Sequence, residues 1–113
     1  SPINMVRLRY AENRIEVRGF NNNTLDLNYN INSVIPNQRN KVLLTLEDNQ
    51  VKIYFNGVLK TTDTSYIIPI GLDRINFANR TGTGNVFQGK VNEVRVYDTV
   101  LTEAEAIELT TLW

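Results

Sequence analysis

The periodicity of the chain changes once between residue 87 and residue 112, and this change limits what the chain can fold into. From 87 to 97, β-branched and aromatic residues alternate with charged or amide residues, which predicts a half-buried β-strand. Thr102 and Glu105 then have the spacing of a helix capping box, and apolar residues between 107 and 112 form one short helical stripe. This region is therefore expected to be a strand followed by one short helix.

Upstream, short alternating segments predict more strands. Residues 6–10 and 14–20 place apolar and charged side chains on opposite faces and are expected to form a hairpin. Asn56-Gly57 predicts another hairpin, because a type I′ turn needs positive φ at both central positions. The remaining expected strands are residues 24–31, 41–46, 51–55, 58–62, 66–70 and 74–78. About nine short strands without βαβ alternation indicate an antiparallel β-sandwich.

Two segments resemble motifs of the concanavalin A-like (laminin-G-like) jelly-roll family. The first matches its hairpin and reads Val51-Lys52-Ile53-Tyr54-Phe55-Asn56-Gly57-Val58. The second matches its closing signature at Phe87, Gly89, Val91, Asn92, Glu93, Val94, Arg95, Val96, Tyr97, Leu101, Thr102 and Glu105, with Asn92 where the family usually has Asp. The resemblance implies an all-β jelly-roll sandwich with one short C-terminal helix.

The resemblance covers about the C-terminal two-thirds of the chain, and residues 1–40 match no motif. We expect residues 1–113 to form a single domain. Two alternatives remain for the N-terminal part. It forms a shortened version of the family's first strands, or the chain is the C-terminal part of a longer protein and a neighbouring chain completes the sandwich.

The composition excludes several kinds of chemistry. The chain has no histidine and no cysteine, so a Ser/His or Cys/His nucleophile pair and a thiolate metal site cannot be built from it. Twelve basic and twelve acidic residues are spread evenly and predict no nucleic-acid binding, and no apolar run is long enough to predict membrane insertion. Glycoside hydrolases of the same jelly roll use an E-x-D-x-E run, which is absent. We therefore expect no enzymatic activity.

The resemblance makes calcium the metal to consider, because many members of the family bind it at the rim formed by their loops. The densest group of oxygen ligands is Glu47-Asp48-Asn49, whereas Asp63 and Asp73 stand alone. Calcium usually requires two or more carboxylates in one site. We interpret residues 47–50 as an ordinary hairpin turn and expect no cofactor, with a bound calcium ion as the alternative.

Two surfaces are candidates for sugar binding, which typically uses an aromatic ring with amide, hydroxyl and guanidinium groups. The first is the Gly-containing loop 79–85 with a nearby tyrosine, and its candidate ligand residues are Tyr66, Asn79, Arg80, Thr81, Thr83 and Asn85. The second is the polar face of the strand 24–31, made of Asp26, Asn28 and Asn30. The loop could instead be a plain connection, and the strand face could instead be a solvated or subunit-facing surface.

The segment 100–113 resembles the ends of lectin-like domains in bacteriophage tail-fibre and other virion proteins. This resemblance implies non-catalytic recognition of a cell-surface glycan, in a virion or extracellular setting. It also implies a homo-oligomer, with the trimer as the state typical of fibres. The alternatives are a structural virion domain without sugar binding, a bacterial adhesin, and a carbohydrate-binding module.

Overall fold

A computed structural model gives the fold, and it describes residues 4–11, 14–35, 38–72, 93–97 and 99–112, with the side chains of residues 10 and 11 left out. This part of the chain contains six strands and one helix. They are β1 (Met5–Ala11), β2 (Arg14–Asn21), β3 (Thr24–Ile31), β4 (Val42–Glu47), β5 (Gln50–Phe55), β6 (Val58–Asp63) and α1 (Glu103–Thr110).

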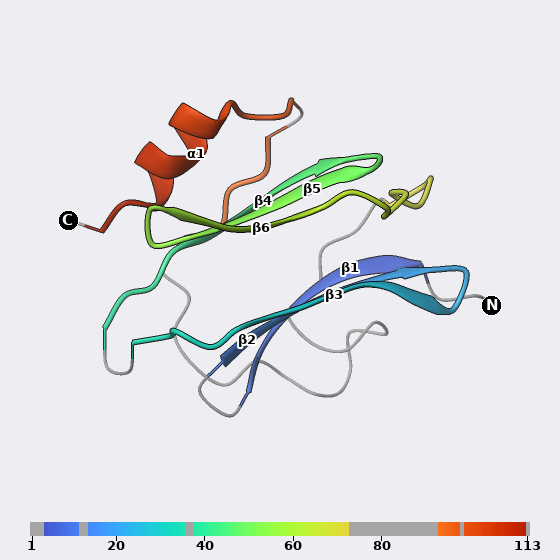
Figure 1. Ribbon diagram of the computed structural model, residues 1–113, viewed down its shortest axis with the longest axis horizontal. Helices are drawn as coiled ribbons and strands as arrows, with labels where there is room; N and C mark the ends of the chain where they lie inside the picture. The colour runs from blue at the N-terminus through green and yellow to red at the C-terminus, as the bar shows by residue number, and fades with distance from the viewer. Residues whose placement is uncertain (1–3, 12–13, 36–37, 73–92, 98, 113) are drawn as a thin grey trace.

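The strands form two antiparallel sheets of three strands each. Sheet A has the order β1-β2-β3 and sheet B the order β4-β5-β6. The two sheets lie face to face as layers, and α1 covers the outer face of sheet B (Figure 1). The outer face of sheet A lies on the opposite side of the molecule from the helix. The predicted antiparallel sandwich with one short C-terminal helix is confirmed.

The core lies between the two sheets. Its buried members are Val17, Leu27, Ile31, Val51, Ile53, Phe55 and Tyr66, and seven partly buried apolar side chains pack around them. In a strand, successive side chains point to opposite faces, so the apolar positions of each alternating segment face the other sheet. The register within each sheet follows from this rule, because a shift by one residue would move charged side chains into the core.

Asparagines form most of the tight turns between these strands. Asn22, Asn23, Asn49 and Asn56 all have positive φ, and Gly57 follows Asn56 with φ of 87°. Asn adopts this backbone conformation more readily than most residues. The turn at Asn56-Gly57 therefore confirms the predicted hairpin, and the turn at Asp48-Asn49 confirms the interpretation of residues 47–50.

The helix begins with the predicted capping box. The hydroxyl oxygen of Thr102 accepts a hydrogen bond from the backbone N–H of Glu105, and the Glu105 carboxylate accepts one from the backbone N–H of Thr102. At the other end, the Thr110 hydroxyl accepts a hydrogen bond from the backbone N–H of Gly57, and Lys41 Nζ donates to the Thr111 carbonyl. These contacts fix the helix against sheet B.

The predicted strand at residues 66–70 is wrong. Two of its backbone N–H groups donate to side chains instead of to a neighbouring strand. The N–H of Tyr66 donates to Asp63 Oδ1, and the N–H of Ile68 donates to Asp48 Oδ1. The Tyr66 carbonyl accepts from the N–H of Asn49. The segment is therefore a loop, and hydrogen bonds hold it between the β4–β5 turn and the core.

The predicted strand at residues 87–97 is wrong for its described part. Residues 93–97 belong to no strand, and Val94 and Val96 are exposed. An alternating segment becomes a strand only when a neighbour supplies backbone hydrogen bonds, and none of the strand pairings in the described sheets includes these residues. Residues 87–92 and the predicted strand at 74–78 lie outside the described residues.

Candidate functional site

Tyr66, the aromatic residue expected to contact a sugar, lies in the core. It is 0% exposed, and its hydroxyl donates a hydrogen bond to the Phe20 carbonyl at 3.2 Å. Its ring packs so closely on Gly19 that a Cβ at this glycine would lie 2.7 Å from the ring. Burial raises the pKa of the phenol, which stays a neutral donor. Tyr66 therefore joins the two sheets, and in this structure its ring is not available to a ligand.

The other five predicted ligand residues lie in loop 79–85, outside the described residues. They are Asn79, Arg80, Thr81, Thr83 and Asn85, and their role in binding stays a prediction.

Two of the three residues of the second predicted surface, Asn28 and Asn30, lie on the outer face of sheet A, and other polar residues extend this surface. Asp26 and Asn28 are exposed, and Asn30 is half-buried. In the register of β2 and β3, Arg18 lies opposite Asn28 and Glu16 opposite Asn30. Asp26 is the extra residue of a bulge, because Gly19 pairs with Leu27 while Phe20 pairs with Leu25.

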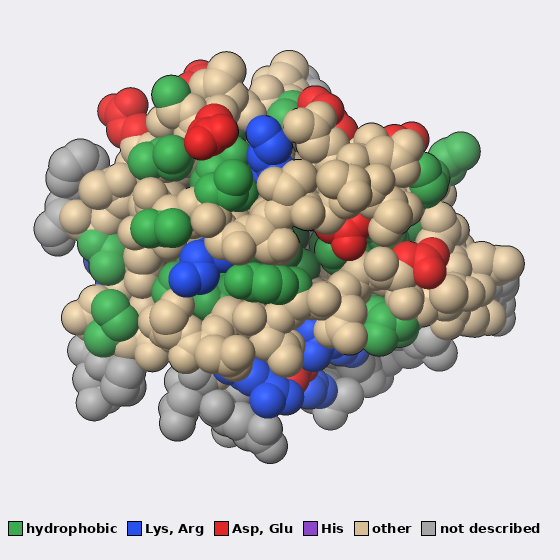
Figure 2. Space-filling view, viewed as in Figure 1, with side chains coloured by type: hydrophobic (Ala, Val, Ile, Leu, Met, Phe, Trp, Pro, Cys, Tyr) green, Lys and Arg blue, Asp and Glu red, His purple; other side chains and the backbone are tan. Residues whose placement is uncertain are grey.

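Strand β1 adds further arginines to the same face. Arg7 lies opposite Arg18, and Arg9 lies opposite Glu16. We call the resulting surface the arginine–asparagine face, and its members are Arg7, Arg9, Arg14, Glu16, Arg18, Asn28 and Asn30. Figure 2 shows Lys and Arg side chains gathered along the lower edge of the molecule, where sheet A lies. Four arginines therefore meet on a chain whose net charge is zero.

Glu16 lies at the centre of this face and is only 2% exposed. Arg9 Nη2 lies 2.7 Å from its Oε1 atom. The Arg14 side chain donates through both Nε and Nη2 to its Oε2 atom, at 3.1 and 2.7 Å. A buried carboxylate is tolerated when it is paired and hydrogen-bonded, and these contacts meet that requirement.

Arg18 is held mainly by the sheet itself. Its Nη1 atom donates to the carbonyl groups of Val17 and Tyr29, and its Nη2 atom donates to Asn30 Oδ1 at 2.8 Å. The same Nη2 atom lies 3.8 Å from the Glu16 carboxylate. Arg18 therefore positions Glu16 and Asn30 and has little capacity left for another ligand.

Arg7 and Arg9 are less completely paired. The guanidinium of Arg7 lies over the Phe20 ring, 5.7 Å from its centroid, and its Nε atom is buried without a hydrogen-bond partner within the described part of the chain. The side chain of Arg9 is 55% exposed and makes its ion pair through one nitrogen. Burial, followed by the charges of Arg9 and Arg18, lowers the pKa of Arg7, although an arginine still stays protonated.

The electrostatics of Glu16 do not suit acid–base catalysis. The hydrogen bonds from Arg14 and the charges of its arginine neighbours lower the pKa of this carboxyl group, despite the opposing effect of burial. A general acid near neutral pH needs a raised pKa and contact with the substrate. Glu16 stays ionised and enclosed, so its role on this face is to hold arginines in place.

Two of the carboxylates considered as calcium ligands, those of Asp48 and Asp63, accept hydrogen bonds from backbone N–H groups. Asp48 Oδ1 accepts from the N–H of Ile68, and Asp63 Oδ1 accepts from the N–H groups of Ser65 and Tyr66. Across the described residues, no group of three or more acidic side chains is arranged to hold a metal ion. Nor does any described helix have the length and apolar character needed to cross a membrane.

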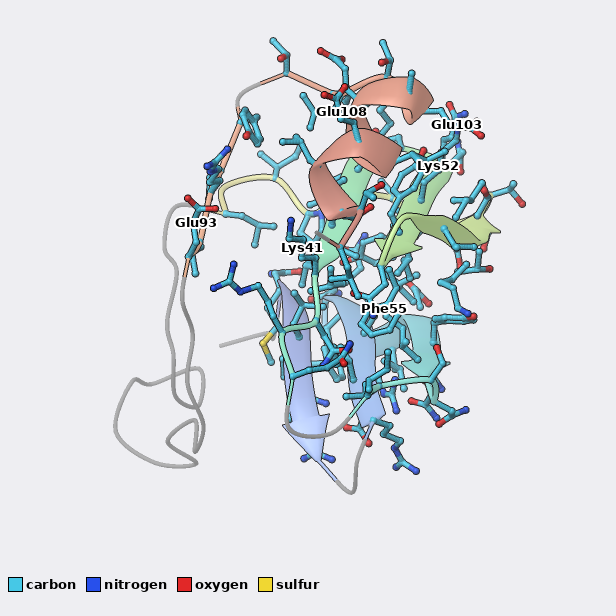
Figure 3. The ribbon with its side chains drawn as sticks, turned by 90° about the vertical axis from the view of Figure 1, so that its left-hand side faces the viewer. Lys41, Lys52, Phe55, Glu93, Glu103 and Glu108 are labelled. Atoms are coloured by element: carbon cyan, nitrogen blue, oxygen red, sulfur yellow. The ribbon has the colours of Figure 1, made fainter. Side chains whose placement is uncertain are left out.

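A separate cleft lies between sheet B and the N-terminus of α1. It has a volume of about 270 Å³, and its lining residues are Thr45, Glu47, Gln50, Lys52, Val100, Leu101, Thr102 and Glu103. Figure 3 shows Lys52 and Glu103 at the same end of the molecule. The cleft combines charges of both signs and has no aromatic residue in its lining, whereas guanidinium and amide groups gather on the arginine–asparagine face, so the cleft is the weaker sugar site.

The sequence interpretation missed the arginine cluster. An even distribution of charge along the chain suggested no basic patch, but the hairpin of β1 and β2 folds residues 7–9 onto residues 14–18. The signal was present in the alternation, because both segments carry their charged residues at every second position. Pairing the two segments across the turn would have placed all four arginines on one face.

The comparisons with known proteins agree with this architecture. The sequence matches the family described as the concanavalin A-like lectin/glucanases superfamily over residues 3–106. The chain belongs to this superfamily. A comparison with curated proteins finds no match.

The chain is also similar to the crystal structure of an S-layer domain-containing protein from Clostridium thermocellum ATCC 27405. The TM-score is 0.57 at 16% sequence identity, which shows a shared fold. The match covers 98% of this chain and 58% of the other.

The substitution Glu16→Gln should destabilise the domain by about 3 kcal/mol, because it leaves several arginines without their shared counter-charge. The ordinary pKa of an unfolded Glu is about 4.3, and the folded value is lower. The carboxylate therefore stabilises the fold fully above about pH 4.3, and this contribution disappears as the pH falls through the folded pKa. Urea unfolding of both proteins between pH 3 and pH 7 measures the effect, and the variant should lack this acid-dependent loss.

Glu93→Gln is the matched control, because Glu93 pairs with Arg95 at 2.8 Å where both side chains are more than half exposed. An exposed pair contributes little to stability because solvent screens its charges, so this variant should unfold almost like the parent. The account of the arginine–asparagine face would be contradicted if Glu16→Gln and the parent protein had the same free energy of unfolding at neutral pH and lost the same amount of it at low pH.

Proposed function

We propose that this domain recognises glycans without catalysis, through the arginine–asparagine face of sheet A. One observation carries the proposal. Guanidinium groups and amide groups meet on one face of a three-stranded sheet, where they can hydrogen-bond to sugar hydroxyls. Membership of a superfamily of lectins and glucanases supports the same class of ligand.

The absence of catalysis is part of the proposal. A glycosidase needs two carboxyl groups about 5–10 Å apart across the scissile bond, one of them able to act as an acid. Glu16 is ionised and enclosed by arginines, and Asp26 stands on an exposed bulge of β3. This arrangement supports binding and does not support general acid catalysis.

The setting that we propose is the outside of a cell or virion. The S-layer domain-containing protein supports a surface location, and the resemblance of residues 100–113 to lectin-like domains supports a receptor-binding module of a tail fibre. In either setting the partner is a cell-surface glycan. The predicted residues of loop 79–85 would supply a second group of contacts.

A second candidate is a structural assembly domain, and the distribution of apolar side chains favours it. Ile70 is 100% exposed and Val96 is 73% exposed, and further apolar residues are exposed on several strands. Apolar surface of this kind often becomes buried between subunits. Assembly and glycan recognition are compatible, since a fibre tip performs both.

Light scattering tests the assembly. We expect a homo-oligomer, with the molar mass of a trimer if the domain belongs to a fibre. Replacing Val96 and Ile70 by Ser should then lower the molar mass, because these side chains would contribute to the subunit contacts. A mass of 12.9 kDa at all concentrations would contradict the proposed assembly.

Screening the purified domain on a glycan array tests recognition. We expect binding to a limited set of glycans, and Asn28→Ala should weaken it about tenfold through the loss of hydrogen bonds to the sugar. Thr62→Ala changes an exposed residue of sheet B and should leave binding unchanged. Arg80→Ala measures the contribution of loop 79–85. The proposal is wrong if a folded, oligomeric sample binds no glycan on the array.

A further inference from the structure

The arginine–asparagine face carries more positive charge than its own carboxylates neutralise. Four arginines share this face with a single carboxylate among its members, that of Glu16. One carboxylate cannot balance the charges of Arg7, Arg9 and Arg18 together, so this part of sheet A keeps an excess of positive charge. A neutral sugar would not use this excess charge, whereas an acidic sugar would.

Two arginines are available for an added anion. Arg9 projects with more than half of its side chain exposed and uses one nitrogen for Glu16, although a guanidinium carries five N–H donors. Arg7 lies two residues away on the same face of β1, where its guanidinium packs over the Phe20 ring. Its Nε atom is buried, so a ligand would contact this guanidinium through the terminal nitrogens.

Glu16 indicates which anion fits. Its carboxylate oxygens lie 2.7 Å from Arg9 Nη2 and 2.7 Å from Arg14 Nη2, which are short charge-assisted contacts. The spacing of the strands thus already suits a carboxylate between guanidinium groups. A second carboxylate, bound by Arg7 and Arg9 from the solvent side, would extend the same pattern.

We propose that the ligand of this face is a carboxylate-bearing polysaccharide, such as a chain of uronic acid units. This inference rests on the proposed glycan recognition and names its class of ligand. Arg7 and Arg9 bind the sugar carboxylate, Asn28 hydrogen-bonds to adjacent hydroxyl groups, and Glu16 and Arg18 position the arginines. The sugar carboxylate then offsets part of the positive charge that Arg7, Arg9 and Arg18 place close together.

Polygalacturonate and its methyl ester form a matched pair of probes, because they share a backbone and differ in the charge of the carboxyl group. Affinity electrophoresis of the full chain should show binding to the acid and at least about tenfold weaker binding to the ester. Arg7→Gln and Arg9→Gln should each weaken binding to the acid at least about tenfold. Arg95→Gln removes the same charge from an exposed ion pair elsewhere and should change little.

The outcomes separate the ligand class from glycan recognition. Equal binding to the acid and its ester, unaffected by Arg9→Gln, overturns the carboxylate inference and leaves the proposed function in place. Binding to no glycan at all, here or on an array, overturns the proposed function.

Non-specific attraction gives a different pattern. Binding to dextran sulfate or polyglutamate as tight as to polygalacturonate overturns the inference, and so does an equal loss in Arg95→Gln. Circular dichroism confirms that each variant is folded. If Arg7→Gln is unfolded, Arg7→Lys, which keeps the charge but lacks the planar group of five donors, replaces it and should still bind less tightly than the parent protein.

Discussion

The alternation of side chains along β2 connects the core of this domain with its surface. β2 is the central strand of sheet A, and its odd-numbered positions, Ile15, Val17 and Gly19, face sheet B. Its even-numbered positions, Glu16 and Arg18, form the centre of the arginine–asparagine face. A slip of one residue would bury charged groups in the core, so apolar packing on one side also fixes the charges on the other.

A buried tyrosine that lies outside both sheets helps to hold them together. Tyr66 belongs to neither sheet, yet it fills the space beside Gly19 and donates to the carbonyl of Phe20 on β2. Asp48 and Asp63 fix its connection through backbone hydrogen bonds. The position of sheet A against sheet B thus depends on the packing of Tyr66, and the turn between β2 and β3 depends on Asn22 and Asn23.

Local pattern was sufficient to predict much of this fold. The hairpin at Asn56-Gly57, the strand at residues 24–31 and the capping box at Thr102 each depend on nearby residues, and each is confirmed. The alternation within that strand is interrupted by the bulge at Asp26, which leaves Leu25 exposed. Residues 66–70 were mistaken for a strand because their apolar character reflects burial of Tyr66 and not pairing. The charged face was missed because it depends on cross-strand register, which brings residues distant in the sequence together.

The central claim is that the outer face of sheet A is the glycan site, and an NMR titration tests it most directly. Amide chemical shifts of the labelled domain would be followed as trigalacturonate is added. The account predicts that the largest changes lie in β1, β2 and β3, at and beside Arg7, Arg9 and Asn28. Changes confined to loop 79–85 or to the cleft beside α1, or no change at all, would contradict it.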